Sequence, residues 1–275
     1  MSEYTIKALC PESELSPYKT FECGQCFRWN PDANGDYVGV ASGRAARVFA
    51  RGDTAFIECE AQDVDFWREY LDMETDYAAA RRSVMIGDYL TECAEYGKGI
   101  RILRQDKWEA LCSFIISQCN NIPRIKSITE KLCSLFGEPF ETPWGVKYSF
   151  PSAGRVALLE EPELAPLRSG YRAAYIIEAA RAVASGDIDL EYAAALGGDE
   201  ARKYLKTLNG VGDKVANCAV LFGLHRMDAF PVDVWIKRAL REHMPAGFDA
   251  KSLGEYAGLA QQYMFFHARE TSKSG

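Results

Sequence analysis

Histidines are scarce in this sequence, and long apolar runs are missing. Only three histidines occur in 275 residues, and none is spaced with a cysteine pair as half of a zinc site. No stretch approaches the ~20 apolar residues of a membrane span, and the first residues lack the pattern of a secretory signal. We therefore expect a soluble protein without membrane contacts, in a bacterial cytoplasm or a eukaryotic nucleus.

Excess positive charge is also lacking. The formal net charge is −7, and a uniformly negative surface repels phosphates. This balance argues against a polybasic protein that binds nucleic acid nonspecifically. Any contact with nucleic acid must use a local basic patch or backbone N–H groups, which bind phosphate without changing the charge count.

Cysteines are present in an odd number, nine, and several lie within apolar helical patterns that suit a reducing compartment. Cys23 and Cys26 in FECGQCFRW have the Cys-x-x-Cys spacing of half zinc sites and redox dithiols. A zinc site needs a second half-site and a redox dithiol needs a strand-to-helix context, and the sequence offers neither. We expect the pair to be incidental, with no metal and no cofactor.

The patterning predicts an α+β fold. Short alternating segments rich in β-branched and aromatic residues lie between about 36 and 60 and are separated by the turn signals NGD, ASGR and RGD. They predict an antiparallel β subdomain over 1–75. Helical spacing begins at Asp63, a candidate N-cap, and dominates a second region over 76–268. The polar residues 269–275 are predicted to be a frayed tail.

The segment from Asp199 to Leu224 predicts a helix–hairpin–helix. A helical pattern meets the turn LNGVG, and a second helix begins at Asp213. Gly210 and Gly212 allow a phosphate to approach the N–H groups at the start of that helix. An ordinary helical hairpin with a glycine-rich turn fits the same pattern, so the flanking residues must decide.

Two flanking residues suggest chemistry. Lys214 lies in the first turn of the second helix, and Cys218 lies one turn later on the same side. Asp233 follows Lys214 by nineteen residues, in FPVDVWIKRAL. A solvated lysine and a helix-capping aspartate are the structural alternatives, and capping is compatible with a second role. An amine beside a carboxylate can act as nucleophile and cation stabiliser at a sugar carbon.

These residues carry a resemblance to a known family. LNGVG, the lysine two residues later and PVD resemble the bifunctional branch of the helix–hairpin–helix DNA glycosylase superfamily. Further motifs, in this order, resemble 8-oxoguanine DNA glycosylases of the eukaryotic type: GQCFRW at 24–29, NNIPRI at 120–125, GYRAAYI at 170–176, KVANC at 214–218 and GLAQQYMFF at 258–266. The resemblance covers residues 20–268.

The resemblance implies a monomeric DNA glycosylase and lyase that acts in base excision repair without a cofactor. Its partner is damaged duplex DNA, from which it excises 8-oxoguanine, preferably opposite cytosine. Lys214 is implied as the nucleophile that forms a Schiff base, and Asp233 as the group that stabilises the sugar cation. β-Elimination at the abasic site would follow.

The same resemblance implies the binding residues. The Gly24 carbonyl would accept a hydrogen bond from N7–H of 8-oxoguanine, a donor that guanine lacks. The other implied base-binding residues are Phe114, Cys218, Gln261 and Phe265. The implied DNA-binding residues are Asn120, Asn121, Arg124, Tyr171, Arg172, Gly210, Gly212 and Trp235. Among these, Tyr171 would enter the base stack, and the two arginines would read the orphaned cytosine.

Two other functions stay open at this point, a noncatalytic helix–hairpin–helix DNA-binding module and a thiol oxidoreductase. Lys214 with Asp233 argues against the first, and the β-loop setting of Cys23 argues against the second. A cluster-bearing endonuclease is disfavoured because no cysteine follows Cys218. One departure stands out: Cys119 occupies a position where the family usually has asparagine.

Overall fold

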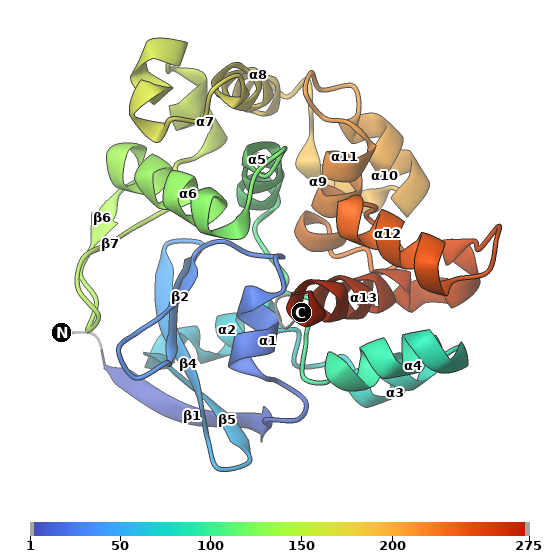
Figure 1. Cartoon of the computed structure of the whole chain (residues 1–275). Coiled ribbons are helices and arrows are strands. Elements are labelled where there is room, and N and C mark those ends of the chain that lie inside the picture. Colours follow the sequence, from blue (N-terminus) through green and yellow to red (C-terminus); the bar gives the residue numbers. More distant parts are fainter. Residues whose placement is uncertain (1–2, 273–275) are drawn as a thin grey trace.

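The first part of the chain forms a five-stranded antiparallel sheet. The structure, a computed structural model, describes residues 3–272. The strands lie in the order β1-β5-β4-β3-β2 (Figure 1). Their bounds are β1 Tyr4–Pro11, β2 Trp29–Pro31, β3 Tyr37–Ala41, β4 Arg44–Arg51 and β5 Thr54–Glu60. The predicted meander is confirmed as β3, β4 and β5, and β1 and β2 extend it at its two edges.

The turn between β3 and β4 shows why the sheet follows the sequence pattern. Ala41 pairs with Arg44, so only Ser42 and Gly43 connect the strands. Both have positive φ angles, 49° and 72°. A two-residue turn of this hand matches the twist of the two strands, and glycine adopts it at little cost.

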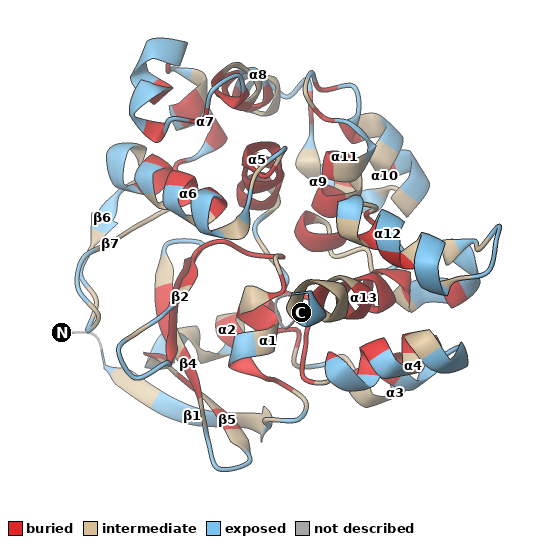
Figure 2. Ribbon diagram, viewed as in Figure 1, coloured by how far each residue is buried: buried red, intermediate tan, exposed pale blue. Residues whose placement is uncertain are grey.

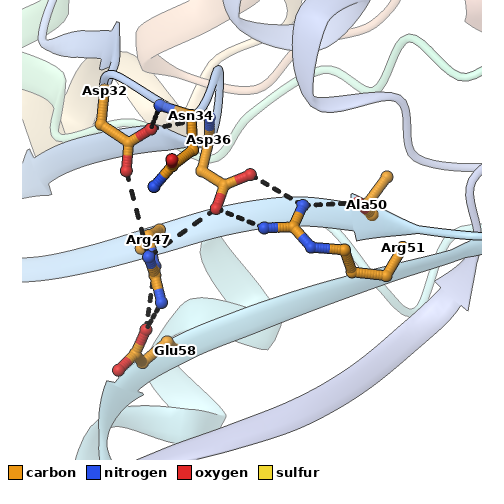
Figure 3. Close-up of polar contacts among 7 residues, drawn as sticks. All are labelled: Asp32, Asn34, Asp36, Arg47, Ala50, Arg51 and Glu58. Atoms are coloured by element: carbon orange, nitrogen blue, oxygen red, sulfur yellow. Dashed lines mark hydrogen bonds and ion pairs between the residues drawn. The ribbon is translucent and has the colours of Figure 1, made fainter.

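Charged side chains link the central strand β4 to its neighbours in the sheet. Figure 3 shows Arg51 donating to both oxygens of Asp36, at 2.9 and 2.8 Å, from the neighbouring strand. Arg47 donates from Nε to Glu58 on β5 at 2.9 Å and lies 3.7 Å from Asp36. Paired arginine–carboxylate contacts of this kind fix side chains in a defined geometry. Here they hold the loop that precedes β3 against the sheet.

The sheet encloses a small aromatic core around Trp29. Its ring stacks on Phe21 at a centroid distance of 4.1 Å, and its indole N–H donates to the Tyr70 hydroxyl at 3.0 Å. A Cβ added to Gly39 would lie 2.1 Å from the Trp29 ring. Only glycine at position 39 therefore leaves room for this indole.

The remainder of the chain is mainly helical, as predicted. The helices are α1 Pro17–Glu22, α2 Val64–Tyr70, α3 Tyr77–Val84, α4 Gly87–Tyr96, α5 Lys107–Ile116, α6 Ile122–Phe136, α7 Ala153–Ala157, α8 Arg172–Ser185, α9 Leu190–Ala195, α10 Gly198–Leu205, α11 Asp213–Cys218, α12 Val234–His243 and α13 Ala257–Thr271. Short 3-10 turns occupy η1 Ala61–Asp63, η2 Glu161–Leu167 and η4 Ala250–Tyr256, a π-helical turn occupies η3 Ala219–Gly223, and strands β6 Pro139–Phe140 and β7 Lys147–Tyr148 form a small hairpin. Among the described helices, none has the length and apolar character needed to cross a bilayer.

One predicted helix cap is wrong. Asp63 directly precedes α2, but its side chain makes no capping hydrogen bond. Its carboxylate instead accepts from Nε of Arg44 at 2.9 Å. Asp63 is the last residue of the 3-10 turn η1 and has φ −99° and ψ 3°, so its backbone is not in the extended conformation of an N-cap. Its carboxylate ties the start of α2 to the sheet instead.

The last helix, α13, packs against α1 beside the sheet. Figure 1 shows α13 lying next to α1, and the Tyr18 hydroxyl on α1 donates to Glu270 on α13 at 3.0 Å. Helix α13 continues to Thr271, so the predicted frayed tail is wrong for residues 269–271. Residues 273–275 of that tail lie outside the described residues.

Buried residues form two cores. Figure 2 shows buried segments, in red, both in the sheet and in the helical region. One lies under the sheet and the other runs through the helical region. The chain crosses between them more than once, because Phe27 packs in the helical core and Leu103 packs in the sheet core. The boundary at residue 75 therefore stays a prediction.

Candidate active site and DNA-binding surface

The predicted helix–hairpin–helix is formed by α10 and α11. In the turn between them, Gly210 has φ +76°, and an added Cβ would lie 2.3 Å from the Tyr175 ring. Only glycine allows the turn to pass under this tyrosine. The turn borders a hollow of about 600 Å³ that is also lined by Gln118 and Tyr171. The hairpin turn, the GYRAAYI motif and a residue just before the NNIPRI motif therefore meet here.

Lys214 is held at the edge of this hairpin by two contacts. Its Nζ donates a hydrogen bond to the Ser117 hydroxyl at 2.9 Å and lies 5.3 Å from the centroid of the Phe114 ring. The Ser117 hydroxyl itself donates to the Phe114 carbonyl at 2.8 Å, which leaves its oxygen free to accept from the lysine. Lys214 is therefore not a freely solvated lysine.

Asp233 caps α12, as predicted. Its Oδ1 accepts from the backbone N–H of Ile236 at 2.9 Å. Burial raises the pKa of the Cys218 thiol, the Lys214 ammonium lowers it and the Asp233 carboxylate raises it further. The charges of Lys214 and Asp233 therefore act in opposite directions on the pKa of the same buried thiol.

Gly24 and Phe265, two of the predicted base-binding residues, lie in contact with each other. Gly24 has φ +79°, and an added Cβ would lie 3.1 Å from Cε1 of Phe265 and 3.3 Å from Cδ1 of Ile122. Gln261 is only 3% exposed and accepts from the Gln262 amide at 3.1 Å, so it is not a solvated surface residue. The Gly24 loop therefore packs against α13 through Phe265.

Phe114 lies deeper than predicted. It is 2% exposed, and its ring stacks on Phe222 at a centroid distance of 5.2 Å. It also packs edge-on to Phe27. Phe114 is therefore a core residue, and its ring lies next to the Lys214 ammonium.

The Gly24 loop is anchored by its neighbour Gln25. The buried amide of Gln25 donates to the carbonyls of Thr20 and Arg101 at 2.9 and 2.7 Å, and its side-chain oxygen accepts from the backbone of Leu103 at 2.9 Å. A fully satisfied buried amide fixes the loop to the adjoining helix α1 and to the distant 101–103 segment. The Gly24 carbonyl is thereby held in a defined direction.

The 119–124 segment is shaped by its own side chains. The Asn121 side chain caps α6 by accepting from the Arg124 N–H at 3.0 Å, and Asn120 donates to the Ile116 carbonyl at 3.1 Å. Arg124 is exposed and donates to the Arg168 carbonyl at 3.1 Å. Cys119 is exposed and has φ +46°, in the left-handed region.

Arg172 differs from what its predicted role suggests. It is 5% exposed, and its guanidinium donates to the carbonyls of Gln118 and Ser169 at 2.8 and 3.0 Å. A further bond reaches the Cys119 carbonyl at 3.1 Å. In this structure the donors of Arg172 hold the backbone of the 118–119 turn and do not face solvent, so direct reading of a base stays a prediction.

Tyr171 and Trp235 lie at the surface of this region to different degrees. Tyr171 is 53% exposed, and its ring packs edge-on to Tyr175 at 5.8 Å. Trp235 is half-buried in the first turn of α12, beside the exposed Val234. An exposed tyrosine next to the hairpin fits a contact with another molecule.

Comparison with known proteins identifies the family. The family model for the N-terminal domain of 8-oxoguanine DNA glycosylase matches residues 7–111. The model for the HhH-GPD superfamily of base excision DNA repair proteins matches residues 112–251. The chain belongs to the 8-oxoguanine DNA glycosylase family.

Individual members of the family support this assignment. A solved structure of MBOgg1 in complex with a low-affinity DNA ligand has a TM-score of 0.90 at 39% identity and covers 99% of this chain and 97% of that one. The 8-oxoguanine glycosylase/lyase of Clostridium acetobutylicum, in complex with DNA containing cytosine opposite 8-oxoguanine, also has a TM-score of 0.90, at 32% identity, covering 99% and 98%.

A curated relative matches over a shorter span. The N-glycosylase/DNA lyase of Saccharomyces cerevisiae is 44% identical over 153 residues, which is 51% of this chain and 41% of that protein. The chain thus matches less than half the length of this relative. Family membership rests on the two family models and on the solved structures.

The family assignment agrees with the state of Cys23 and Cys26. Both thiols are buried, and burial raises the pKa of Cys23 to about 12 and that of Cys26 well above its usual value. The thiolate is the reactive form of cysteine, so this shift disfavours redox chemistry at the pair. The thiol oxidoreductase hypothesis therefore has no support at this loop.

Motif reasoning missed one residue of this site, Ser117. It lies between the motif residues Phe114 and Asn120, but nothing in its local pattern distinguishes it from a helical serine. Only the packing of α5 against α11 brings its hydroxyl to Lys214.

Proposed function

We propose that this protein excises 8-oxoguanine from duplex DNA as a glycosylase and then cleaves the strand as a lyase. The observation that carries the proposal is the Lys214 amine in the first turn of α11, which is held by the Ser117 hydroxyl at 2.9 Å and lies 5.3 Å from the centroid of the Phe114 ring. A noncatalytic DNA-binding module has no use for an amine held against a hydroxyl and an aromatic ring. Membership of the 8-oxoguanine glycosylase family supports the same activity.

Recognition begins when the damaged nucleotide leaves the base stack. Extrusion costs a few kcal/mol, which contacts in the pocket must offset. The Gly24 carbonyl accepts a hydrogen bond from N7–H of 8-oxoguanine. Guanine has a lone pair at N7, so the same carbonyl would face an acceptor, and the unsatisfied pair costs roughly 1–3 kcal/mol. One backbone oxygen thus discriminates between 8-oxoguanine and guanine. Phe265 and Cys218 cover the two faces of the base, and Gln261 binds its Watson–Crick edge.

Catalysis follows at the sugar. The neutral Nζ of Lys214 attacks C1′, a C–N bond forms, and the bond to N9 of the base breaks with its electron pair leaving on the base. The Asp233 carboxylate stabilises the positive charge that develops on the sugar. The sugar ring then opens: the C1′–O4′ bond breaks, O4′ takes up a proton, and the nitrogen of Lys214 becomes the Schiff base at C1′. The Schiff base acidifies the C2′ proton, and loss of this proton breaks the C3′–O bond and expels the 3′ phosphate. This sequence requires no metal or redox cofactor.

Contacts with the rest of the duplex come from the surface around the hairpin. The turn amides at Gly210 and Gly212 bind the phosphate backbone, and Tyr171 fills the gap beside the extruded nucleotide. Arg124, with its exposed guanidinium, is placed to read the orphaned cytosine, and Asn120 and Asn121 shape the turn before it. Action as a monomer is implied by the family resemblance and stays a prediction. Location in a bacterial cytoplasm or a nucleus stays a prediction.

Borohydride trapping tests the proposal. Wild-type protein is incubated with an 8-oxoguanine·cytosine duplex and borohydride, and a covalent adduct is expected. Lys214→Gln should abolish both the adduct and base excision while duplex binding remains. Asp233→Asn should slow excision strongly and keep the fold, since asparagine also caps helices. Duplex binding by the wild type without adduct or excision would support the noncatalytic module instead.

A further inference from the structure

Arg269 connects the two walls of the base pocket. It lies near the end of α13, four residues after Phe265, in the segment where the sequence predicts a frayed tail. Its guanidinium carbon lies 5.5 Å from the centroid of the Phe265 ring and 5.8 Å from that of Phe266. A cation over an aromatic face is attracted by the ring quadrupole. Arg269 therefore holds the ring that is proposed to cover the flipped base.

The same guanidinium reaches the start of the Gly24 loop. Its Nη2 donates a hydrogen bond to the carbonyl of Glu22, the last residue of α1 and two residues before Gly24. A helix end presents carbonyls without intrahelical partners and carries partial negative charge, so a guanidinium is well suited to this position. The Gly24 loop is thus fixed from α13 as well as from its own Gln25.

Further contacts hold Arg269 itself in one orientation. Glu270 accepts from its Nε at 3.1 Å and from its Nη2 at 2.9 Å, and Tyr18 on α1 donates to the other oxygen of Glu270. The Arg269 and Glu270 side chains are each 12% exposed. On the other side of the loop, Lys126 of α6 donates to the Glu22 carboxylate at 2.8 Å. Glu22 is therefore clamped between α6 and α13.

We propose that Arg269 is a positioning residue that keeps the Gly24 carbonyl and the Phe265 ring in register, and that it thereby sets the preference for 8-oxoguanine over guanine. This inference rests on the proposed function. A single carbonyl discriminates between the two bases only if it cannot move aside, and sites of this kind need positions held to about 0.5 Å. Gly24 and Phe265 are already in van der Waals contact range, so a shift of either wall changes the space for the base.

The test measures duplex affinity in a Lys214→Gln background, where no base is released. Three duplexes of one sequence carry 8-oxoguanine, guanine or a tetrahydrofuran abasic analogue opposite cytosine. Arg269→Ala should weaken binding of the 8-oxoguanine duplex by roughly tenfold, the scale of one charge-assisted hydrogen bond. Binding of the abasic duplex should not change, because no base enters the pocket. Arg269→Lys keeps the cation but lacks the planar fork. Its affinity for the 8-oxoguanine duplex should lie between those of the parent protein and of Arg269→Ala.

Arg181→Ala is the matched control. This arginine also donates to backbone carbonyls, of Ala157 and Leu159, and to a glutamate, Glu160 at 2.8 Å, but far from the pocket. Equal loss on all three duplexes, or no loss on the 8-oxoguanine duplex, would overturn the role of Arg269. If Arg269→Ala does not fold, the lysine variant decides by the same comparison. A parent protein that does not prefer 8-oxoguanine over guanine would instead refute the proposed function.

Discussion

The ammonium group of Lys214 donates a hydrogen bond of 2.9 Å to the hydroxyl of Ser117. The two residues come from α11 and α5, so the bond exists only when these helices are packed. The Ser117 hydroxyl is oriented by its own bond to the Phe114 carbonyl, and its oxygen points a lone pair at the lysine. The amine of the proposed nucleophile is thus aimed by a group outside the hairpin.

Removing this hydroxyl should impair catalysis but not DNA binding. We expect Ser117→Ala to slow single-turnover excision by about tenfold or more, because a hydrogen bond to a charged group is lost. Ser117→Thr should restore most of the rate. The control is Ser113→Ala, a buried serine one turn earlier on α5. Equal excision by the two alanine variants would show that Ser117 does not orient the amine.

The sequence pattern could predict what depends on local chemistry. The alternation in β3 to β5, the two glycines of the hairpin and the Asp233 cap all follow from neighbouring residues. The roles of Ser117 and Arg269 could not be predicted, because each depends on a contact between helices distant in the chain. Arg172 shows the same limit. Its position at the start of a helix suggests a solvated side chain, but its guanidinium is buried and donates to the backbone carbonyls of Gln118 and Cys119.

A charge at the hairpin is expected to weaken DNA binding. Asp213, the first residue of α11, accepts from Lys206 at 2.7 Å and from Arg202 at 3.0 Å. These cations are therefore occupied by a carboxylate where a phosphate is proposed to bind. Asp213→Asn should tighten duplex binding several-fold and make the affinity fall more steeply with salt. A titration at several salt concentrations measures both.

Glu160→Gln is the control for this change, since Glu160 pairs with Arg181 outside the hairpin. It removes the same charge from the chain, so it isolates the effect of position. Equal gains for both variants would mean that only net charge matters. No gain for Asp213→Asn would place Lys206 and Arg202 away from the DNA.

The buried carboxyl group of Glu109 should make the free energy of unfolding depend on pH. Burial raises its pKa to about 7, although Arg28 acts in the opposite direction. A carboxyl whose pKa is higher in the folded state favours folding below its unfolded pKa and loses this contribution as pH rises toward 7. Glu109→Gln has no such titration. The variant should therefore gain stability relative to wild type between pH 4.5 and 7.5, by about 2–3 kcal/mol. Urea unfolding at each pH measures the difference, and a constant difference would show that Glu109 is not held in its neutral form.

Cys119 provides a test of the orphan-base site. Its φ of +46° lies in the left-handed region, where asparagine is tolerated better than other side chains with a Cβ. The bond from Arg172 to its carbonyl holds the turn in this shape. Cys119→Asn should therefore stabilise the fold, by a few tenths to about 1 kcal/mol. Urea unfolding measures this gain, with Cys119→Ala as the control that removes the thiol without supplying an amide.

The same substitution should act on the choice of opposite base. An asparagine amide both donates and accepts hydrogen bonds in the gap left by the flipped base, whereas a thiol does so only weakly. We expect excision to become modestly more selective for cytosine, measured on duplexes with C, T, G or A opposite 8-oxoguanine. Cys119→Ala should show no such gain. A more stable Cys119→Asn protein with wild-type selectivity would mean that the side chain at 119 relieves backbone strain but does not face the orphaned base, and Arg124 would then have to supply the preference from the neighbouring helix.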